Sequence, residues 1–430
     1  MELFIKSLTN YLLGTSEEFI AQRASKLINK CENQEFDITF PSASKLDIWK
    51  KCIGKHENEI SFDGLMKVEQ ESDYVTLSQY LPWPVTRILS KNDKVLLKLD
   101  RQCVIKSIVT QIYFEGIISR KPDCAKTVSL DNCELVRNAG KCSSRQLTQL
   151  RTNQIFHALR RLLSVCGHDI VPTNEANYVL KIGCSDIRHL KKHENDIPLK
   201  IGQVKIKSNE STKEYYNMTE IYKSMCDKML AIANERDCKG SMQDVRRQTK
   251  MIASAELQIM LFGRNMDRSI NINNFEDDGN VAKEGTFILY NYARINQLLE
   301  SFDVQRKNYG NMIAIEEIDF SFLKEPEEWD IIVNGVIPYI ETIATISDIN
   351  FNDIDCHETL NRCLHRICAH VSKLSNIYSK YYRRVKVLKE GLQGSSADQT
   401  LSAKLYFIRA IKLVYDHAFY VLGIVPVKYM

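Results

Sequence analysis

A row of cations near the C-terminal end of the sequence has the spacing of one helical face. The cations recur at steps of four, seven, seven and four: Arg362, Arg366, Lys373, Lys380 and Arg384. Apolar residues of the same segment recur at alternating steps of four and three: Leu360, Leu364, Ile367, Val371, Leu374, Tyr378 and Tyr381. At about 100° per residue, the two sets lie on opposite faces of a helix. The segment therefore predicts an amphipathic helix with one cationic face, which is suited to binding anions.

The charge of this region is one-sided. Between Arg362 and Lys412 there are eleven Lys or Arg residues and only two carboxylates, Glu390 and Asp398, although the formal net charge of the whole chain is +4. Surface helices usually interleave both signs, because opposite charges one turn apart stabilise the helix. We therefore favour a binding surface for a polyanion over the alternative of a helix face that is merely solvated.

Aromatic residues accompany the last cations of the row. Tyr381 and Tyr382 directly precede Arg383 and Arg384, and Lys386 follows two residues later. Unpaired RNA bases stack on aromatic rings while their phosphates meet cations. Since Tyr381 continues the apolar spacing, it is expected in the core. Tyr382 is the candidate for stacking on a base.

Two other features that could indicate a metal-binding or phosphate-binding site do not predict one. The set Cys363, His365, Cys368 and His370 has the residue types of metal ligands. On one straight helix, however, these side chains face different sides and cannot converge on a tetrahedral ion. A glycine-rich phosphate-binding loop is also missing from the sequence. We therefore expect neither a metal nor a cofactor.

The elements that position these residues follow from the periodicity of the sequence. The pattern predicts a strand at 95–99 and helices at 104–114 and 147–166. Gly167 is suited to end the last of these helices, and a further strand is expected directly after it. From about residue 251 helical periodicity dominates, with a loop expected at 391–398. Residues 175–250 are polar and lysine-rich, and their pattern assigns no element.

Composition indicates a soluble protein of a reducing compartment. The 13 cysteines include no C-x-x-C pair, which favours free thiols. The first residues mix apolar and charged side chains and lack the apolar core of a signal peptide. No apolar run reaches the length of a membrane span. We therefore expect a cytoplasmic protein that does not bind membranes.

The end of the sequence resembles that of the arginyl-tRNA synthetases. The resemblance lies in Arg409-Ala410, Leu422-Gly423-Ile424, Pro426 and the terminal Met430. In these enzymes the ending belongs to the anticodon-binding domain, called the DALR domain. The resemblance implies that an anticodon stem-loop packs against the last helices, close to Met430. Together with Arg383 and Lys386, which accompany Tyr382, Arg409 and Lys412 are expected among the tRNA contacts.

Two upstream segments extend the resemblance. Residues Gly285-Thr286-Phe287 with Tyr290, Ala293 and Arg294 resemble the stretch that joins the catalytic body of the synthetases to their helical domain. Tyr290 and Arg294 are therefore expected at a domain junction. Residues 146–170 resemble the helix that carries the signature sequence His-Ile-Gly-His-Leu-Arg and ends in Gly-His-Asp.

The same segment departs from the synthetases where their chemistry resides. Gln146 and Gln149 replace the two signature histidines, which stabilise charge on the phosphates of ATP. Glutamine is neutral and cannot supply a cation. No Lys-Met-Ser-Lys-type loop follows, and the nearest lysine-rich piece, Lys205-Ile206-Lys207-Ser208, departs too far from it. Fewer than about a hundred residues separate the block from the helical part, too few for a complete core of that class. The sequence predicts a protein without catalytic residues.

The resemblance implies an α+β multidomain fold that is mostly α. We expect a small α/β domain at 1–120 that resembles the N-terminal domain of the synthetases. A degenerate, shortened nucleotide-binding-type α/β core is expected at 121–305, and a DALR-type helical bundle at 306–430.

One non-catalytic family combines these features, and the chain resembles it: the family of DALR anticodon-binding domain-containing protein 3. Its motifs include Asp319-Phe320-Ser321-x-Leu323 and Glu328-Trp329. Membership implies an adaptor that binds arginine tRNAs and hands them to a methyltransferase-like enzyme that makes 3-methylcytidine in the anticodon loop.

Two alternatives remain. A compact adenylating enzyme is disfavoured by Gln146 and Gln149. A protein-interaction scaffold without RNA binding is disfavoured by the cationic face.

Overall fold

The computed structural model describes most of the chain as two compact units. The described residues are 1–15, 17–31, 35–54, 60–68, 74–117, 126–133, 143–184, 193–207, 218–235, 241–273, 284–304, 312–353, 355–388 and 394–427. Unit 1 comprises Met1–Thr110 and Glu316–Val333, and unit 2 comprises Gln111–Ile315 and Asn334–Met430. The three-domain division of the sequence stays a prediction.

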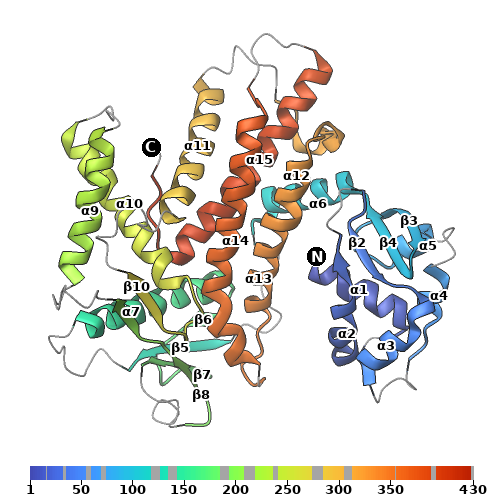
Figure 1. Cartoon of the computed structure of the whole chain (residues 1–430), viewed down its shortest axis with the longest axis horizontal. Coiled ribbons are helices and arrows are strands. Elements are labelled where there is room, and N and C mark those ends of the chain that lie inside the picture. The colour runs from blue at the N-terminus through green and yellow to red at the C-terminus, as the bar shows by residue number, and fades with distance from the viewer. Residues whose placement is uncertain are drawn as a thin grey trace. The chain divides into compact units, whose positions relative to one another are not determined.

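Unit 1 is built on an antiparallel sheet with strand order β1-β2-β4-β3 (Figure 1). Its strands are β1 (Asn29–Lys30), β2 (Ile38–Pro41), β3 (Val85–Lys91) and β4 (Lys94–Leu99). Its helices are α1 (Glu2–Leu13), α2 (Glu18–Ala24), α3 (Leu46–Ile53), α4 (Asp63–Val68) and α5 (Tyr74–Gln79), together with the first part of α6 (Arg101–Glu115). Asn92 and Asp93 both have positive φ and form the tight turn between β3 and β4. The predicted strand at 95–99 and helix at 104–114 are confirmed.

The segment 316–333 completes unit 1 and explains two of the family motifs. The carboxylate of Asp319 accepts a hydrogen bond from the backbone N–H of Ser321 at 2.9 Å and so caps a 3₁₀ turn. Glu328 is fully buried and forms a capping box with Glu325 at the start of α12 (Pro326–Asp330). These residues fix the local path of the chain.

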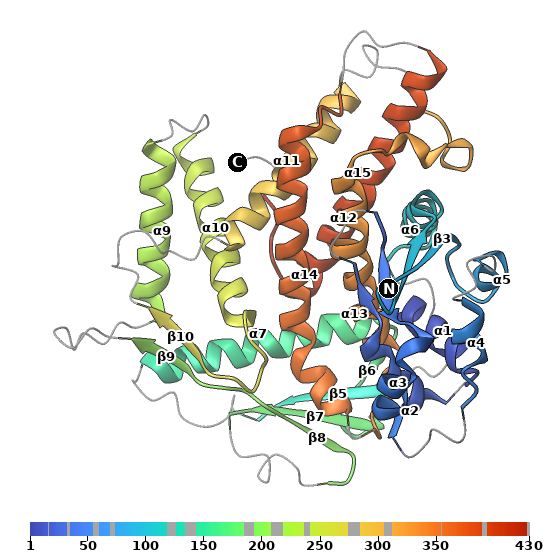
Figure 2. The same cartoon turned by 45° about the vertical axis from the view of Figure 1, so that its right-hand side comes forward.

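Unit 2 contains a parallel sheet with strand order β6-β5-β7-β8. Its strands are β5 (Thr127–Asn132), β6 (Asp169–Ile170), β7 (Tyr178–Gly183) and β8 (Asp196–Lys200). A separate parallel pair consists of β9 (Val204–Lys207) and β10 (Ile270–Asn273). The helix α7 (Ser143–Val165) crosses above the sheet and packs against strands on one side and α14 and α15 on the other (Figure 2). The predicted helix and the strand after Gly167 are confirmed.

Further helices are described in unit 2. They are α9 (Met218–Glu235), α10 (Met242–Phe262), α11 (Glu284–Val304), α13 (Ile337–Ser347), α14 (Cys356–Arg384) and α15 (Ser395–Leu422). The helices α11, α14 and α15 pack on one another side by side (Figures 1 and 2). A π-helical stretch, Ile331–Val336, precedes α13. The predicted fold class is confirmed, since a mostly helical chain surrounds a sheet-containing α/β core.

Two expectations about the helical part were wrong in their limits. The helical region expected from about residue 251 already begins with α9 at Met218, and residues 175–250 hold β7, β8, β9, α9 and the start of α10. The polar, lysine-rich composition of that region concealed short strands and the helices α9 and α10. The loop expected at 391–398 ends earlier, since α15 begins at Ser395 after Gly394, which has a φ of 118°.

Candidate nucleic-acid interface

The helix α14 has the two faces that its spacing predicts. All seven apolar positions of the row are buried, including Tyr378 and Tyr381 at 0% exposure. The five cations Arg362, Arg366, Lys373, Lys380 and Arg384 are all exposed. Arg383 and Arg384 also occupy the last turn, where cations offset the negative end of the helix dipole. We call the exposed row the α14 stripe.

Anions and polar groups accompany the first part of the α14 stripe. Arg362 forms an ion pair with Glu358 one turn earlier, outside the segment in which carboxylates are rare. The Lys373 Nζ donates to the Asn334 side-chain oxygen at 3.4 Å. Exposed ion pairs contribute little and leave the cation accessible to another anion. Among the described residues, the side chains of Arg366 and Lys380 form no ion pair at 4.0 Å or less.

The two cations expected on α15 are more strongly engaged. Arg409 lies 4.0 Å from the Asp303 carboxylate and 5.7 Å from the Tyr406 ring centroid. The Lys412 ammonium forms a 2.6 Å ion pair with Asp416, whose other oxygen accepts a hydrogen bond from the Tyr292 hydroxyl. This pairing raises the pKa of Lys412 despite the desolvation that lowers it. Lys412 therefore contributes to the packing of α11 against α15.

The most specific geometry lies where the α14 stripe meets α11. The guanidinium carbon of Arg294 is 4.0 Å from the Tyr290 ring centroid and 4.8 Å from the Tyr382 ring centroid. Arg294 also donates to the Tyr290 hydroxyl at 2.6 Å. The Tyr382 ring in turn lies 6.1 Å from that of Tyr378, which is buried. Arg294 and the buried ring of Tyr378 fix the position of Tyr382, whose ring is half-buried.

This cluster brings together residues that were expected to have separate roles. Tyr290 and Arg294 were expected only at a domain junction, whereas the structure brings them to Tyr382. Their four-residue spacing puts Tyr290 and Arg294 on one face of α11, so their contact with each other could have been predicted from the sequence. Their pairing with a tyrosine on another helix depends on tertiary packing.

A hollow of about 530 Å³ opens beside the cluster. The residues that line it come from α11 and from the chain around the end of α14: Gln297, Leu298, Ser301, Tyr382, Arg383, Arg384, Val385, Lys386, Val387 and Leu388. It joins three cations to an aromatic ring and to the amide and hydroxyl of α11. An unstacked base with its phosphates needs this combination of groups.

The degenerate signature positions lie in the first turns of α7. Gln146 and Gln149 are half-buried there, on the helix that the resemblance assigned to them. Two residues later, Arg151 is fully buried and donates to four backbone carbonyls, those of Leu261, Gly202, Arg268 and Asn265, at 2.7–3.1 Å. Burial lowers its pKa to about 10, which leaves it charged at neutral pH. The first turns of α7 therefore hold an architectural arginine beside two neutral side chains.

The Gly285-Thr286 motif positions the start of α11. A Cβ at Gly285 would lie 2.8 Å from the Cα of Glu256, so only glycine permits this approach of α10 and α11. The Glu256 carboxylate, fully buried, accepts hydrogen bonds from the Thr286 backbone N–H and hydroxyl. The crossing fixes the helix that carries Tyr290 and Arg294.

The cysteines and histidines of α14 that have the residue types of metal ligands take part in the packing of the helix. Cys363 and Cys368 are buried, and the His370 ring is hydrogen-bonded to the Thr342 hydroxyl at 3.0 Å. The part of the chain that the structure describes has no cluster of three possible metal ligands. None of its helices is long and apolar enough to cross a membrane. Met430 lies outside the described residues.

A family model matches the part of the chain that carries these residues. Residues 288–430, which include the α14 stripe and the tyrosine cluster, match the DALR anticodon binding domain. The chain is 27% identical over 152 residues to DALR anticodon-binding domain-containing protein 3 of Rattus norvegicus. That match covers 35% of this chain and 27% of the relative, so the similarity spans about a quarter of that protein.

Synthetases are similar over a greater length. Arginine–tRNA ligase of Borreliella burgdorferi is 21% identical over 397 residues, which covers 89% of this chain and 60% of the ligase. The structure of arginyl-tRNA synthetase from Plasmodium falciparum matches the whole of both chains with a TM-score of 0.58 at 10% identity. The chain therefore has a fold similar to that of the arginyl-tRNA synthetases, and its residues 288–430 belong to the DALR anticodon-binding domain family.

Proposed function

We propose that this protein binds arginine tRNAs through its DALR domain without aminoacylating them, and that it presents them to a methyltransferase that makes 3-methylcytidine in the anticodon loop. The observation that carries the binding is the junction of the α14 stripe with Tyr382. There a row of exposed cations ends at a ring held by Arg294. The row follows phosphates, and the ring stacks on a loop base.

The adjoining hollow supports a single-stranded target. Its cations, Arg383, Arg384 and Lys386, meet the phosphates on either side of an unstacked base. The Gln297 amide and the Ser301 hydroxyl supply donors and acceptors for a base edge. In an A-form duplex the Watson–Crick edges are paired and the major groove is too narrow for side chains, whereas the unstacked bases of a loop expose these edges. The anticodon loop of a tRNA has this form.

Loss of catalysis is supported at α7 and β9. The neutral Gln146 and Gln149 occupy the helix start where synthetases need cationic or proton-donating side chains. The lysine-rich piece Lys205–Lys207 is part of β9, which pairs in register with β10 and does not form a loop. Fixed donors for developing phosphate charge contribute much of the rate of such reactions, so their absence slows adenylation by orders of magnitude.

The tRNA identity and the partner rest on likeness. The Borreliella relative is named an arginine–tRNA ligase, which supports arginine tRNAs as the ligands. The methyltransferase-like partner follows from the resemblance to the DALR anticodon-binding domain-containing protein 3 family. A cytoplasmic location of the protein is part of the proposal, supported by a composition that favours free thiols.

Sequencing of RNA that co-purifies with the tagged protein tests the first step. We expect enrichment of arginine tRNAs over tRNAs of other amino acids, together with binding that weakens steeply as salt rises. Recovery of no tRNA above a tag-only control would reject RNA binding and favour the protein-interaction scaffold.

Reconstitution tests the second step. A 3-methylcytidine methyltransferase is incubated with an arginine tRNA transcript, with and without this protein, and the modified base is measured by mass spectrometry. We expect modification to depend on the protein. Equal modification in its absence would remove the adaptor role and leave tRNA binding unaffected.

A further inference from the structure

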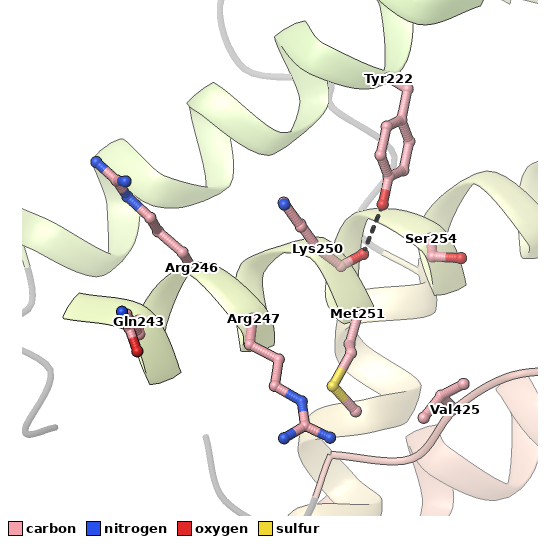
Figure 3. Close-up of a pocket in the computed structure, with 8 residues that line it drawn as sticks. All are labelled: Tyr222, Gln243, Arg246, Arg247, Lys250, Met251, Ser254 and Val425. Carbon is pink, nitrogen blue, oxygen red and sulfur yellow. Dashed lines mark hydrogen bonds between the residues drawn. The ribbon is translucent and has the colours of Figure 1, made fainter. Parts of the chain in front are cut away.

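A second cationic surface lies on α10, well separated in sequence from the α14 stripe. Arg246, Arg247 and Lys250 occupy adjacent turns of one helix, and all three are exposed. Figure 3 shows Arg246 and Lys250 on the side of α10 that faces α9, and Arg247 on the side of Val425. Among the described residues, none of these three cations forms an ion pair with a carboxylate at 4.0 Å or less.

The two carboxylates of α10 do not neutralise this surface. Asp244 is held in the first turn, where its carboxylate accepts a hydrogen bond from the Ser241 hydroxyl at 2.6 Å. Glu256 is fully buried against α11. The exposed middle of α10 therefore carries three cations and no carboxylate of its own.

The cations border a hollow of about 470 Å³. Its other walls are Tyr222 of α9, Met251 and Ser254 of α10, and Val425 after the end of α15 (Figure 3). The Tyr222 hydroxyl donates to the Lys250 carbonyl at 3.1 Å, which fixes the ring beside the cations. The hollow thus combines positive charge with a ring and a thioether surface, a combination that suits nucleotides.

The position of α10 connects this hollow to the DALR domain. Within unit 2, α10 packs on α11, which carries Tyr290 and Arg294, and on α14, which carries the stripe. The buried contacts at Gly285 and Glu256 fix that packing. The two surfaces are therefore held in a fixed relative position before binding. A ligand that spans both of them binds with little entropy cost for ordering the protein.

We infer that the α10 hollow is a second RNA-binding site, in which Arg246, Arg247 and Lys250 hold successive phosphates of the tRNA that the α14 stripe binds. The inference rests on the proposed function and extends it from one surface to two. RNA is favoured over an acidic protein segment because the hollow offers stacking surfaces as well as charge. The cations lie on both sides of α10, so the strand crosses the helix.

Removal of the three cations tests the site. The variant R246Q/R247Q/K250Q changes only exposed side chains, so folding is retained. Its control, K126Q/R160Q/K200Q, removes the same charge from other parts of unit 2. Binding of an arginine tRNA transcript is measured across a salt series. For three contacts at about −0.7 each, the slope of log affinity against log salt flattens by about 2, and low-salt affinity falls at least tenfold.

Each outcome separates the two proposals. Wild-type protein that binds no tRNA rejects the proposed function itself. Wild-type affinity and slope in the α10 variant, or an equal loss in the charge control, reject the α10 site and leave the proposed function intact. The bound tRNA transcript is also challenged with polyglutamate and with single-stranded RNA of equal charge. Equal displacement by the two competitors would reject an RNA site, in favour of a surface that binds an acidic protein segment or anions in general.

A substitution that removes no cation gives an independent measurement. Ser254 is exposed in the hollow, so S254D places a carboxylate among the phosphates, whereas S254N has nearly the same shape without the charge. We expect S254D to weaken tRNA binding severalfold and S254N to bind like the wild type. Equal binding by both variants would contradict the site.

Discussion

The carboxylate of Glu256 accepts two hydrogen bonds from Thr286, one from the backbone N–H at 2.8 Å and one from the hydroxyl at 3.1 Å. Both bonds use the same carboxylate oxygen, and the other oxygen is buried without a partner among the described residues. Burial raises the pKa of Glu256 to about 7, although the bonds from Thr286 lower it. The crossing of α10 and α11 is therefore built around a carboxyl group that titrates near neutral pH.

This arrangement predicts a stability that declines with rising pH. The folded protein binds the Glu256 proton more tightly than the unfolded chain, whose pKa is 4.5. Its contribution to stability is complete below pH 4.5 and is lost as the pH rises to about 7. The two pKa values correspond to a loss of about 3 kcal/mol at most. Denaturant unfolding between pH 5 and 8 measures it.

The variant E256Q should remove this dependence, because the amide stays neutral and keeps an acceptor for Thr286. The variant E115Q makes the same change at an exposed position of α6 and serves as the control. We expect a flatter pH profile for E256Q alone. Parallel profiles for E256Q and the wild type would show that Glu256 does not titrate in this range.

A second prediction concerns the end of the α14 stripe. Replacement of Lys380 and Arg384 by Gln should weaken tRNA binding and flatten its salt dependence by one to two contacts, at about 0.7 each. The double variant R160Q/K200Q removes two exposed cations from α7 and β8 and should bind as the wild type does. If affinity and slope both stay at wild-type values in K380Q/R384Q, the stripe is a solvated face and the scaffold becomes the better hypothesis.

The aromatic cluster predicts a different signature. Tyr382→Ala should cost about 1–3 kcal/mol of tRNA binding, the usual loss for one stacked base, with little change in salt slope. Tyr382→Phe keeps the ring and should bind nearly as well as the wild type. Comparable losses for Ala and Phe would indicate that the hydroxyl, and not stacking, makes the contact.

Coupling between Arg294 and Tyr382 follows from their contact. Arg294→Gln removes the guanidinium that lies over the Tyr382 ring, so part of its loss should vanish in the Tyr382→Ala background. We expect a coupling free energy of about 0.5–3 kcal/mol from the double-mutant cycle in tRNA binding. Additive losses would mean that Arg294 binds RNA independently of Tyr382.

The start of α7 predicts an absence of chemistry. Purified protein should show no ATP–pyrophosphate exchange with arginine, and restoring both histidines in Q146H/Q149H should not create it, since Lys205–Lys207 is held in β9. Changing Gln146 and Gln149 to Ala should leave tRNA affinity within about threefold, because such changes usually cost under about 0.5 kcal/mol. Exchange above background, or a tenfold loss of affinity, would contradict these two expectations respectively.

Local periodicity was sufficient to predict the helix that carries the cations. The faces of α14 follow from spacing alone, because its apolar residues all pack on one side. The Tyr290–Arg294–Tyr382 cluster could not be predicted in the same way, since it depends on how α11 and α14 pack. The role of Arg151 was hidden for a related reason. Its four carbonyl partners come from chain segments 51 to 117 residues away, and backbone acceptors leave no mark in the sequence.

The lysine-rich region shows the opposite limit. Residues 175–250 lack a strong period because β7, β8 and β9 are short and α9 and α10 expose long polar faces. Their cations therefore gave no hypothesis from sequence. Only the packing of α9, α10 and Val425 gathers Arg246, Arg247 and Lys250 around one hollow.

The end of α15 is joined to α7 by Arg161. Its Nε donates to the Val421 carbonyl at 3.0 Å across 260 residues of chain, and a side chain at Gly423 would collide with its guanidinium. A ribosome must therefore synthesise α15 before α7 can reach its final environment. Contacts so distant in sequence slow folding and leave intermediates with exposed apolar surface. We expect nascent chains of this protein to stay dependent on chaperones until synthesis has passed residue 423.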